Sequence, residues 1–165
     1  SARLALKEFL EIHGADARFF PLGIEEIYEN FSLNTPVDPL EGALDLLSEL
    51  KETHQLALVT VGSVEYQFEK MKKAGVDSTI FSRIAVSEEG NKKPYYQEIV
   101  TELGFHPSEV LVCGDRISAD LAPAKELGFR TVHLLWGRGL NSLHAQSQIV
   151  DATILKLAEI KKLLV

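Results

Sequence analysis

Cysteine is nearly absent from this 165-residue chain, and its single cysteine, Cys113, excludes an internal disulfide bond. Because disulfides accumulate in oxidising compartments, we expect a reducing, cytoplasmic location. Cys113 lies in the apolar stretch VLVCG, where no nearby histidine or lysine would lower the pKa of its thiol. We therefore expect a buried, unreactive thiol rather than a catalytic one.

Long apolar runs and an excess of positive charge are also missing. No apolar run approaches the roughly 18 residues that span a bilayer, and the N-terminal stretch SARLALKEFLEIHG carries acids, unlike a signal peptide. The net charge of −7 argues against a general surface for nucleic acid or anionic membrane. The five histidines lack the spacing of zinc ligands. We expect neither nucleic acid nor membrane as a partner.

The first part of the chain reads as helix. Apolar residues recur at helical spacing in residues 2–14 and again in residues 23–31. The turn-rich stretch SLNTPVDP follows, with two prolines, and we place a boundary there. This divides the chain into residues 1–37 and residues 38–165.

A new helix is predicted directly after this boundary. Asp38 stands as its N-cap, Pro39 at its first position and Glu41 at its third, which is the pattern of a capping box. Four leucines and Ala43 then recur at helical spacing from Leu40 to Leu50.

Short apolar strands then alternate with amphipathic helices. The predicted strands are QLALVTV, RIAVS, VLVCG and RTVHLL, with DATI as a further candidate, and the helices between them are VEYQFEKMKKAG, PYYQEIVTELG and SADLAPAKELG, before a closing helix LKLAEIKKLL. Pro123 is expected to cost the SADLAPAKELG helix a backbone bond or to shift its start. This alternation predicts an α/β fold, a Rossmann-like parallel sheet with helices on both faces.

In such a sheet, ligands bind at the carboxyl ends of the strands. The stretch LVCGDRISAD places Asp115 directly after a strand and Asp120 in the first turn of the next helix. Two carboxylates facing one point suit Mg²⁺, which binds through one or two carboxylates with water and phosphate. The alternative is structural: Asp115 caps a turn, and Asp120 favours the helix N-terminus.

Two other strand ends offer groups for an anion. Thr60, Gly62 and Ser63 present hydroxyls and backbone N–H groups at the start of a helix, and the pair Lys92 and Lys93 precedes a proline. Taken alone, each is more often an ordinary turn or a solvated pair of charges.

The ordered set LALVTVGS, KKPYYQEI and VLVCGDRISADLAPAKELGF resembles the haloacid dehalogenase-like (HAD) hydrolase superfamily. DPLEGALDLLSELK is similar to the segment where the helical cap of that family returns to the core, and VDATILKLAEIKKLL to its closing strand and helix. The resemblance covers roughly residues 38–165. It implies that residues 1–37 are the remnant of a helical cap.

The resemblance implies roles for particular residues. Thr60, with Val61 and Gly62, would bind the transferring phosphoryl group, and Lys93, immediately before the proline, would pair with the nucleophile and the phosphate. Asp115 and Asp120 would be the Mg²⁺-binding acids. Val61 stands where many relatives carry Asn, and Arg116 where many carry Ser, which puts substrate preference in doubt.

The family nucleophile, the first Asp of a D-x-D motif after the first core strand, is absent from the chain. That strand is central in the family, between the strands QLALVTV and VLVCG, so we expect this chain alone to be incomplete, with unpaired backbone groups in the gap. The strand would come from a separate or cleaved N-terminal segment, or another segment would fill the slot. Otherwise the sheet closes up.

Two classes of function remain open at this point. The first is a Mg²⁺-dependent phosphatase of a small phosphorylated metabolite, acting through an aspartyl-phosphate, with haloacid dehalogenation as a minor variant. The second is a catalytically inactive binding or regulatory module on the same fold. The retained Thr60, Lys93, Asp115 and Asp120 favour the first, and the missing nucleophile favours the second.

Overall fold

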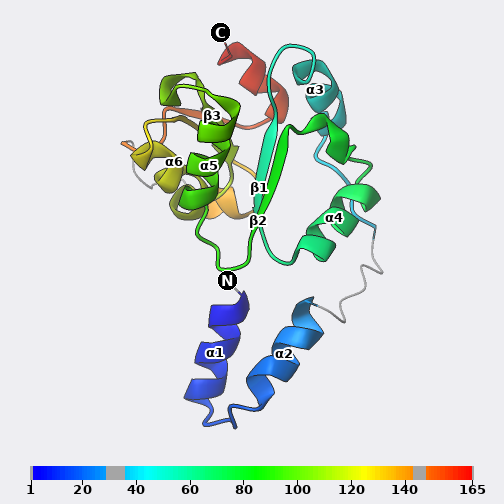
Figure 1. Cartoon of the computed structure of the whole chain (residues 1–165), viewed down its shortest axis with the longest axis vertical. Helices are drawn as coiled ribbons and strands as arrows, with labels where there is room; N and C mark the ends of the chain where they lie inside the picture. Colours follow the sequence, from blue (N-terminus) through cyan, green and yellow to red (C-terminus); the bar gives the residue numbers. More distant parts are fainter. Residues whose placement is uncertain (1, 29–35, 143–147, 165) are drawn as a thin grey trace.

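The N-terminal part is a helical hairpin. The computed structural model describes residues 2–28, 36–142 and 148–164. Helix α1 (Ala2–Ile12) and helix α2 (Phe19–Tyr28) lie side by side and extend away from the rest of the molecule (Figure 1). Helix α2 begins earlier than predicted, and the predicted residues 29–31 lie outside the described part.

The rest of the described chain alternates strands and helices as predicted. In order these elements are α3 (Ala43–Leu50), β1 (Ala57–Val61), α4 (Val64–Lys73), β2 (Arg83–Ser87), α5 (Lys93–Leu103), β3 (Leu111–Gly114), α6 (Ala122–Glu126), β4 (Arg130–Leu134) and β5 (Ala152–Ile154). The connections include the 3₁₀ turns η1 (Ser78–Ile80), η2 (Pro107–Glu109), η4 (Gly137–Ser142) and η5 (Leu157–Lys162) and the π-helical turn η3 (Ile117–Leu121). The α/β prediction is confirmed.

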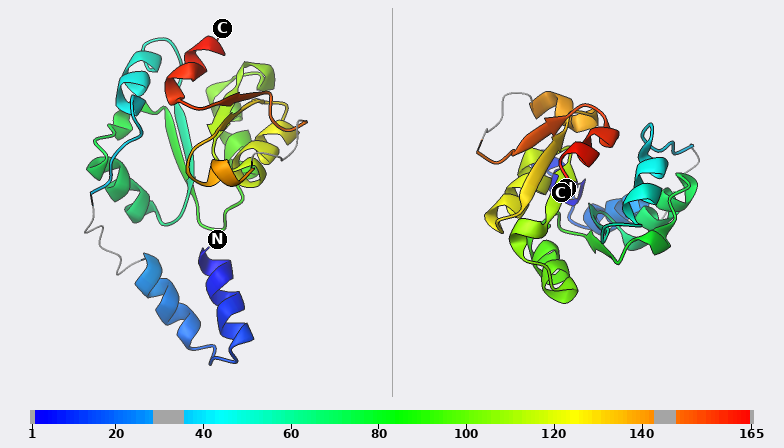
Figure 2. Two further views of the ribbon diagram at one scale, coloured as in Figure 1. Left: turned by 180° about the vertical axis from the view of Figure 1, so that it is seen from behind. Right: turned by 90° about the horizontal axis from the view of Figure 1, so that it is seen from above.

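The strands form two parallel sheets rather than one. Strand β1 pairs with β2, while β3 pairs with β4 and β4 with β5. Among the described residues, no strand pairs with the other edge of β1 or of β3. The break therefore falls between the two strands where the sequence predicted a missing one, and Figure 2 shows the two sheets as separate units.

Strand burial follows this break. The central strand β4 has paired neighbours on both sides, and its last four residues are all buried. Strands β1 and β3 have one paired edge each, and none of their residues is fully buried. This partial exposure agrees with their unpaired edges, because burying backbone groups without partners is costly.

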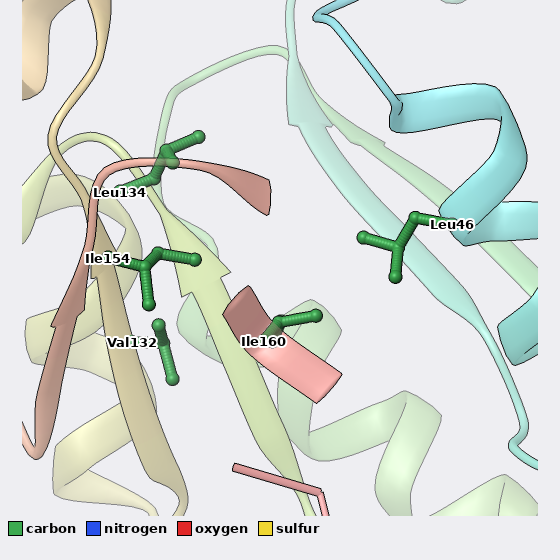
Figure 3. Packing of buried hydrophobic residues seen from close by; sticks show 5 residues of the cluster. All are labelled: Leu46, Val132, Leu134, Ile154 and Ile160. Atoms are coloured by element: carbon green, nitrogen blue, oxygen red, sulfur yellow. The ribbon is translucent and has the colours of Figure 1, made fainter. Parts of the chain in front are cut away.

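Apolar clusters hold the two sheets between helical layers. On one face, Leu46 of α3 belongs to the same cluster as Val132, Leu134, Ile154 and Ile160 of the β4, β5 and η5 region (Figure 3). On the other face, a second cluster around Tyr96, Ala124 and Phe129 also receives Val59 of β1 and Val112 of β3. This second cluster connects one sheet to the other across the break.

The predicted start of helix α3 is wrong. The capping box at Asp38, Pro39 and Glu41 does not form, and the helix begins at Ala43 after Gly42. Gly42 has φ 73°, a left-handed conformation that interrupts a right-handed helix and that glycine adopts readily. The Ala43 N–H donates to the Leu40 carbonyl, so residues 40–43 form a turn.

The closing segment is a 3₁₀ helix rather than the predicted α-helix. Leu157, Ile160 and Leu163 all pack in the first apolar cluster. Side chains three residues apart eclipse one another in a 3₁₀ helix, so this spacing places all three on one face.

Candidate active site

Gly114 ends strand β3 and lets the next acidic segment approach closely. A Cβ atom at this position would lie 2.6 Å from the Cβ of Asp120 and 2.8 Å from its Oδ2. Real side chains do not approach to that distance. The glycine before Asp115 is therefore needed for Asp120 to lie against the end of the strand.

A π-helical turn brings Asp120 back to that point. In η3 the Ala122 N–H donates to the Ile117 carbonyl, the wide i→i+5 pattern of a π-turn, often found at functional sites. Pro123 lacks an N–H and stands at the start of α6, so the regular helix begins only after this turn. The expected effect of Pro123 is confirmed, and the predicted helix 118–128 is split in two.

Asp120 is buried and receives two partners. Its Oδ2 accepts a hydrogen bond from the Arg116 N–H at 3.0 Å, and its Oδ1 lies 2.8 Å from the ammonium of Lys92. Asp120 is 4% exposed and Lys92 is 8% exposed. The Arg116 guanidinium lies farther away, at 3.7 Å from Oδ1. A buried ion pair thus lies next to Gly114, the last residue of β3.

The structure brings Lys92, not the predicted Lys93, to the acidic residues. The ammonium of Lys93 lies 2.6 Å from Glu126 Oε2, and both side chains are exposed. The two lysines line a pocket of about 340 Å³ together with Ser118 and other residues of the η3 and α6 region. The loop that carries Lys92 is fixed by Ser87, whose hydroxyl donates to the Asn91 carbonyl and accepts from the Gly90 N–H.

Asp115 follows β3 directly, in a half-buried position. Its backbone carbonyl accepts a hydrogen bond from His133 Nε2 at 3.2 Å. Its Oδ2 lies 3.9 Å from where a Cβ of Gly137 would stand, so the loop after β4 forms one wall beside the carboxylate. Among the described residues, no side chain pairs with this carboxylate. Sequence reasoning missed His133, because a histidine inside an apolar strand carries no local signal of this contact.

Thr60, Val61 and Gly62 lie at the end of β1, in the other sheet. The Gly62 N–H donates to the Ser87 carbonyl, and Gly62 has φ 142°. The Val61 carbonyl accepts from the side chain of Gln67, 2.8 Å away. Within the described part of the chain, no hydrogen bond connects these three residues to Lys92, Asp115 or Asp120. Like Asp115, they lie at the carboxyl end of a parallel strand, but that strand belongs to the other sheet.

Burial and the nearby acids raise the pKa of two neighbouring residues. Burial, and then the charge of Asp120, raise the pKa of Tyr96, whose hydroxyl donates to the Asp120 carbonyl at 3.3 Å. Burial, followed by the charges of Asp120 and Asp115, raises the pKa of Cys113 to about 11. The thiol is therefore protonated at neutral pH, which agrees with the expected low reactivity, although Cys113 is half-buried rather than buried as predicted.

The donor set agrees with Mg²⁺ bound through one carboxylate. Asp120 Oδ1 is buried without a hydrogen bond of good geometry, although it lies near Lys92. Asp115 presents a carboxylate with no protein partner among the described residues. The same residues contain no group of three or more His, Cys, Asp or Glu side chains that could hold a metal ion. Mg²⁺ accepts one or two carboxylates and completes its shell with water and phosphate, so Asp115 is the better ligand and Asp120 the residue that holds Lys92.

A family model matches most of the chain. Residues 6–134 match the model of the haloacid dehalogenase-like hydrolases. The chain is 33% identical over 105 residues to a glyceraldehyde 3-phosphate phosphatase of Methanocaldococcus jannaschii, covering 61% of this chain and 46% of the relative. It is 28% identical over 128 residues to the protein of the same name in Pyrococcus abyssi, covering 74% and 53%. The chain thus spans about half the length of these relatives.

Solved structures share the fold. The HAD-hydrolase YfnB from Bacillus subtilis, in a crystal structure bound to magnesium, superposes with a TM-score of 0.63 and 27% sequence identity over 76% of this chain and 54% of that one. The magnesium ion in that structure is bound to YfnB. Within the described residues of this chain, no helix is long and apolar enough to cross a membrane.

Proposed function

Because the chain belongs to the haloacid dehalogenase-like hydrolase family, we propose that it supplies the phosphate- and metal-binding part of a Mg²⁺-dependent phosphatase. The substrate is a small phosphorylated metabolite, and the place of action is the cytoplasm. The observation that carries this proposal is the buried ion pair of Lys92 and Asp120 at the end of β3, next to Asp115. Because desolvation offsets much of the attraction in a buried ion pair, such a pair adds little net stability, and its place in this site favours a functional role.

The nucleophile belongs to an Asp outside this chain. Residues 1–165 contain no D-x-D motif, and strands β1 and β3 each leave one edge unpaired among the described residues. A strand between them, from a separate or cleaved N-terminal segment, would end beside Asp115 and Lys92. This arrangement gives the unpaired edges and the buried lysine one common explanation.

In the proposed reaction the phosphoryl group passes through an acyl phosphate. The P–O bond of the ester breaks as a carboxylate oxygen of the nucleophile bonds to phosphorus, and the leaving oxygen takes a proton from solvent to depart as the alcohol. Water then attacks phosphorus and gives one proton back to solvent, the P–O bond to the nucleophile breaks, and the carboxylate and inorganic phosphate are released. When bound, Mg²⁺ neutralises the charge that develops on the phosphoryl oxygens. Lys92 holds one of those oxygens or the nucleophile, and Asp115 holds the ion.

The hydroxyl of Thr60 and the backbone N–H groups beside it are the second proposed contact for the phosphoryl group. Thr60 lies near the carboxyl end of β1, and Asp115 follows the carboxyl end of β3. Strand β1 pairs with β2, and the loop after β2 carries Lys92. Lys93 points to the surface toward Glu126, so its predicted role passes to Lys92 in this proposal.

The relatives favour a phosphate ester over a haloacid. The Methanocaldococcus and Pyrococcus relatives carry the name glyceraldehyde 3-phosphate phosphatase, which makes triose phosphates the first substrates to examine. Displacement of a halide needs no cation, whereas Asp115 presents a carboxylate suited to one.

The test is release of inorganic phosphate by the purified gene product, with glyceraldehyde 3-phosphate and a panel of other phosphorylated metabolites, in Mg²⁺ and in EDTA. We expect activity only with Mg²⁺, and a loss of at least about 100-fold in Asp115→Asn and Lys92→Met, with Lys93→Met close to the native protein. Activity that survives in Asp115→Asn would exclude the metal role. Native and denaturing intact masses show whether a second polypeptide accompanies the chain.

The alternative is a binding or regulatory module without catalysis. It predicts that the gene product releases no phosphate from any substrate, even when a D-x-D segment is present. Retention of phosphate-ester binding in such a protein, measured by calorimetry, would identify the module.

A further inference from the structure

The peptide group between Asp115 and Arg116 is held at both of its polar atoms. On one side, the Asp115 carbonyl accepts from His133 Nε2 at 3.2 Å. On the other, the Arg116 N–H donates to Asp120 Oδ2 at 3.0 Å. The two side chains that hold it are 3% and 4% exposed. Gly114, on the other side of Asp115, is held in the ladder with β4, so this second fixed peptide plane restricts the backbone rotation of Asp115 and with it the direction of its side chain.

His133 is placed for this contact by the sheet itself. It lies opposite Gly114 in the register of β3 and β4, one residue before Asp115. The β3 ladder ends at Gly114, so the next carbonyl has no strand partner, and the imidazole supplies one. A carbonyl oxygen only accepts, so Nε2 carries the proton.

The loop after β4 is packed tightly over this contact. A Cβ atom at Gly139 would lie 3.0 Å from the Asp115 carbonyl oxygen, 3.1 Å from His133 Nε2 and 2.4 Å from the Leu134 carbonyl oxygen. The Gly139 N–H donates to the Trp136 carbonyl, which closes the turn. The glycine thus lets the loop after β4 approach this hydrogen bond closely, at a position where any side chain would clash.

We propose that His133 is a positioning residue that sets the Mg²⁺ affinity of the site by holding the backbone of Asp115. This inference rests on the proposed function, in which Asp115 holds the ion. His133 touches neither substrate nor ion. Groups that orient a metal ligand typically change metal affinity by about 10–100-fold when they are removed.

The alternative explanation is that His133 is a buried polar residue whose hydrogen bond to the nearest carbonyl serves only the stability of the fold. Thr131 provides the matched control, because it lies two residues away on the same strand and is 0% exposed. Its hydroxyl bonds to Asp151 and to the Ile149 carbonyl, away from Asp115. A general loss of packing in β4 would affect Thr131→Val and His133 variants alike.

The experiment titrates the purified gene product with Mg²⁺ alone in a calorimeter and records Tm without metal. Gln places an amide N–H where His133 has Nε2, whereas Asn places one only where it has Nδ1. We expect His133→Gln to retain native affinity, His133→Asn and His133→Leu to weaken it about 10–100-fold, and Thr131→Val to lower Tm with affinity unchanged.

Each other result has a definite meaning. If Asp115→Asn weakens Mg²⁺ binding and His133→Asn does not, the positioning role is wrong and the metal site stands. If Thr131→Val weakens binding as much as His133→Asn, the effect is general packing and the inference is overturned. If Asp115→Asn leaves binding unchanged, both this inference and the metal role in the proposed function fail. Should His133→Leu not fold, the pair of Gln and Asn variants still decides.

Discussion

The ammonium of Lys92 lies 2.8 Å from Oδ1 of Asp120, and both residues are almost fully buried. Its neighbour Lys93 makes a shorter contact, 2.6 Å, with Glu126 at the surface. Distance alone does not rank the two pairs, because water and salt screen the exposed one. Burial makes Lys92 and Asp120 depend on each other.

Lys92→Met is expected to destabilise the fold by about 3–5 kcal/mol, because it leaves the buried Asp120 carboxylate with only the more distant, partly exposed guanidinium of Arg116. Lys93→Met should change stability by about 1 kcal/mol or less, since its partner is solvated. Urea unfolding followed by circular dichroism measures both. The double variant Lys92→Met with Asp120→Asn should regain much of the loss, because no unpaired charge remains. Equal effects of the two single variants would contradict the burial argument.

The sequence alone could predict most of the elements but not which lysine enters the site. Strands β1 to β5 carry local signals in their apolar runs. The ends of α4 and α5 carry them too, since Gly75, two residues after α4, and Gly104, directly after α5, adopt left-handed conformations. Consecutive residues at a helix start point about 100° apart, so the choice between Lys92 and Lys93 depends on where α5 begins. The structure begins α5 at Lys93, with Lys92 outside it.

The contacts around Asp115 depend on tertiary structure. The GD-x₄-D spacing predicted that Asp120 folds back toward Asp115, and the structure brings Asp120 against Gly114, the residue before Asp115. The spacing could not show that Lys92 and the Arg116 N–H occupy the Asp120 carboxylate. These contacts form only in the folded chain, where the loop after β2 and the π-turn bring Lys92 and the Arg116 N–H to Asp120.

Gly114→Ala is expected to destabilise the fold by about 1–3 kcal/mol and to disturb the site, because the new methyl group would overlap Asp120. Gly104→Ala is the control. No atom lies within 4 Å of its added Cβ, so its cost comes only from φ 73° and should be about 1–2 kcal/mol. Mg²⁺ titration separates the two, since only Gly114→Ala should weaken binding. Native Mg²⁺ affinity in Gly114→Ala would show that Asp120 tolerates displacement.

Alkaline pH should destabilise the fold through Cys113. Its pKa rises from 9.0 to about 11 in the folded state, so between pH 9 and pH 11 the unfolded thiol releases its proton while the folded thiol retains it. The unfolded state then binds fewer protons, and the free energy of unfolding falls as pH rises. The raised pKa of Tyr96 acts in the same direction. Urea unfolding from pH 8 to pH 11 should show a smaller decline in Cys113→Ala, and an unchanged slope would contradict the shift.

The same raised pKa predicts the reactivity of the thiol. Cys113 should resist iodoacetamide at pH 8 in the native protein and react rapidly once the protein is unfolded in urea, because only the thiolate is the nucleophile. Mass spectrometry after timed quenching measures the modified fraction. Modification of native Cys113 as fast as of the unfolded protein would mean that the thiol is accessible and ionised.

Hydrogen exchange should report the break between the two sheets. In this chain alone, the outward amides of β1 and β3 have no strand partner among the described residues, whereas β4 is paired on both sides. We expect peptides that cover residues 57–61 and 111–114 to exchange faster than the peptide that covers residues 130–134. In a longer form of the gene product that contains a D-x-D strand, the first two should gain protection while the third changes little. Equal protection of all three peptides in this chain would mean that the sheets close on each other in solution. Strong protection that appears only with the D-x-D strand would place that strand between β1 and β3, with its nucleophile beside Lys92 and Asp115.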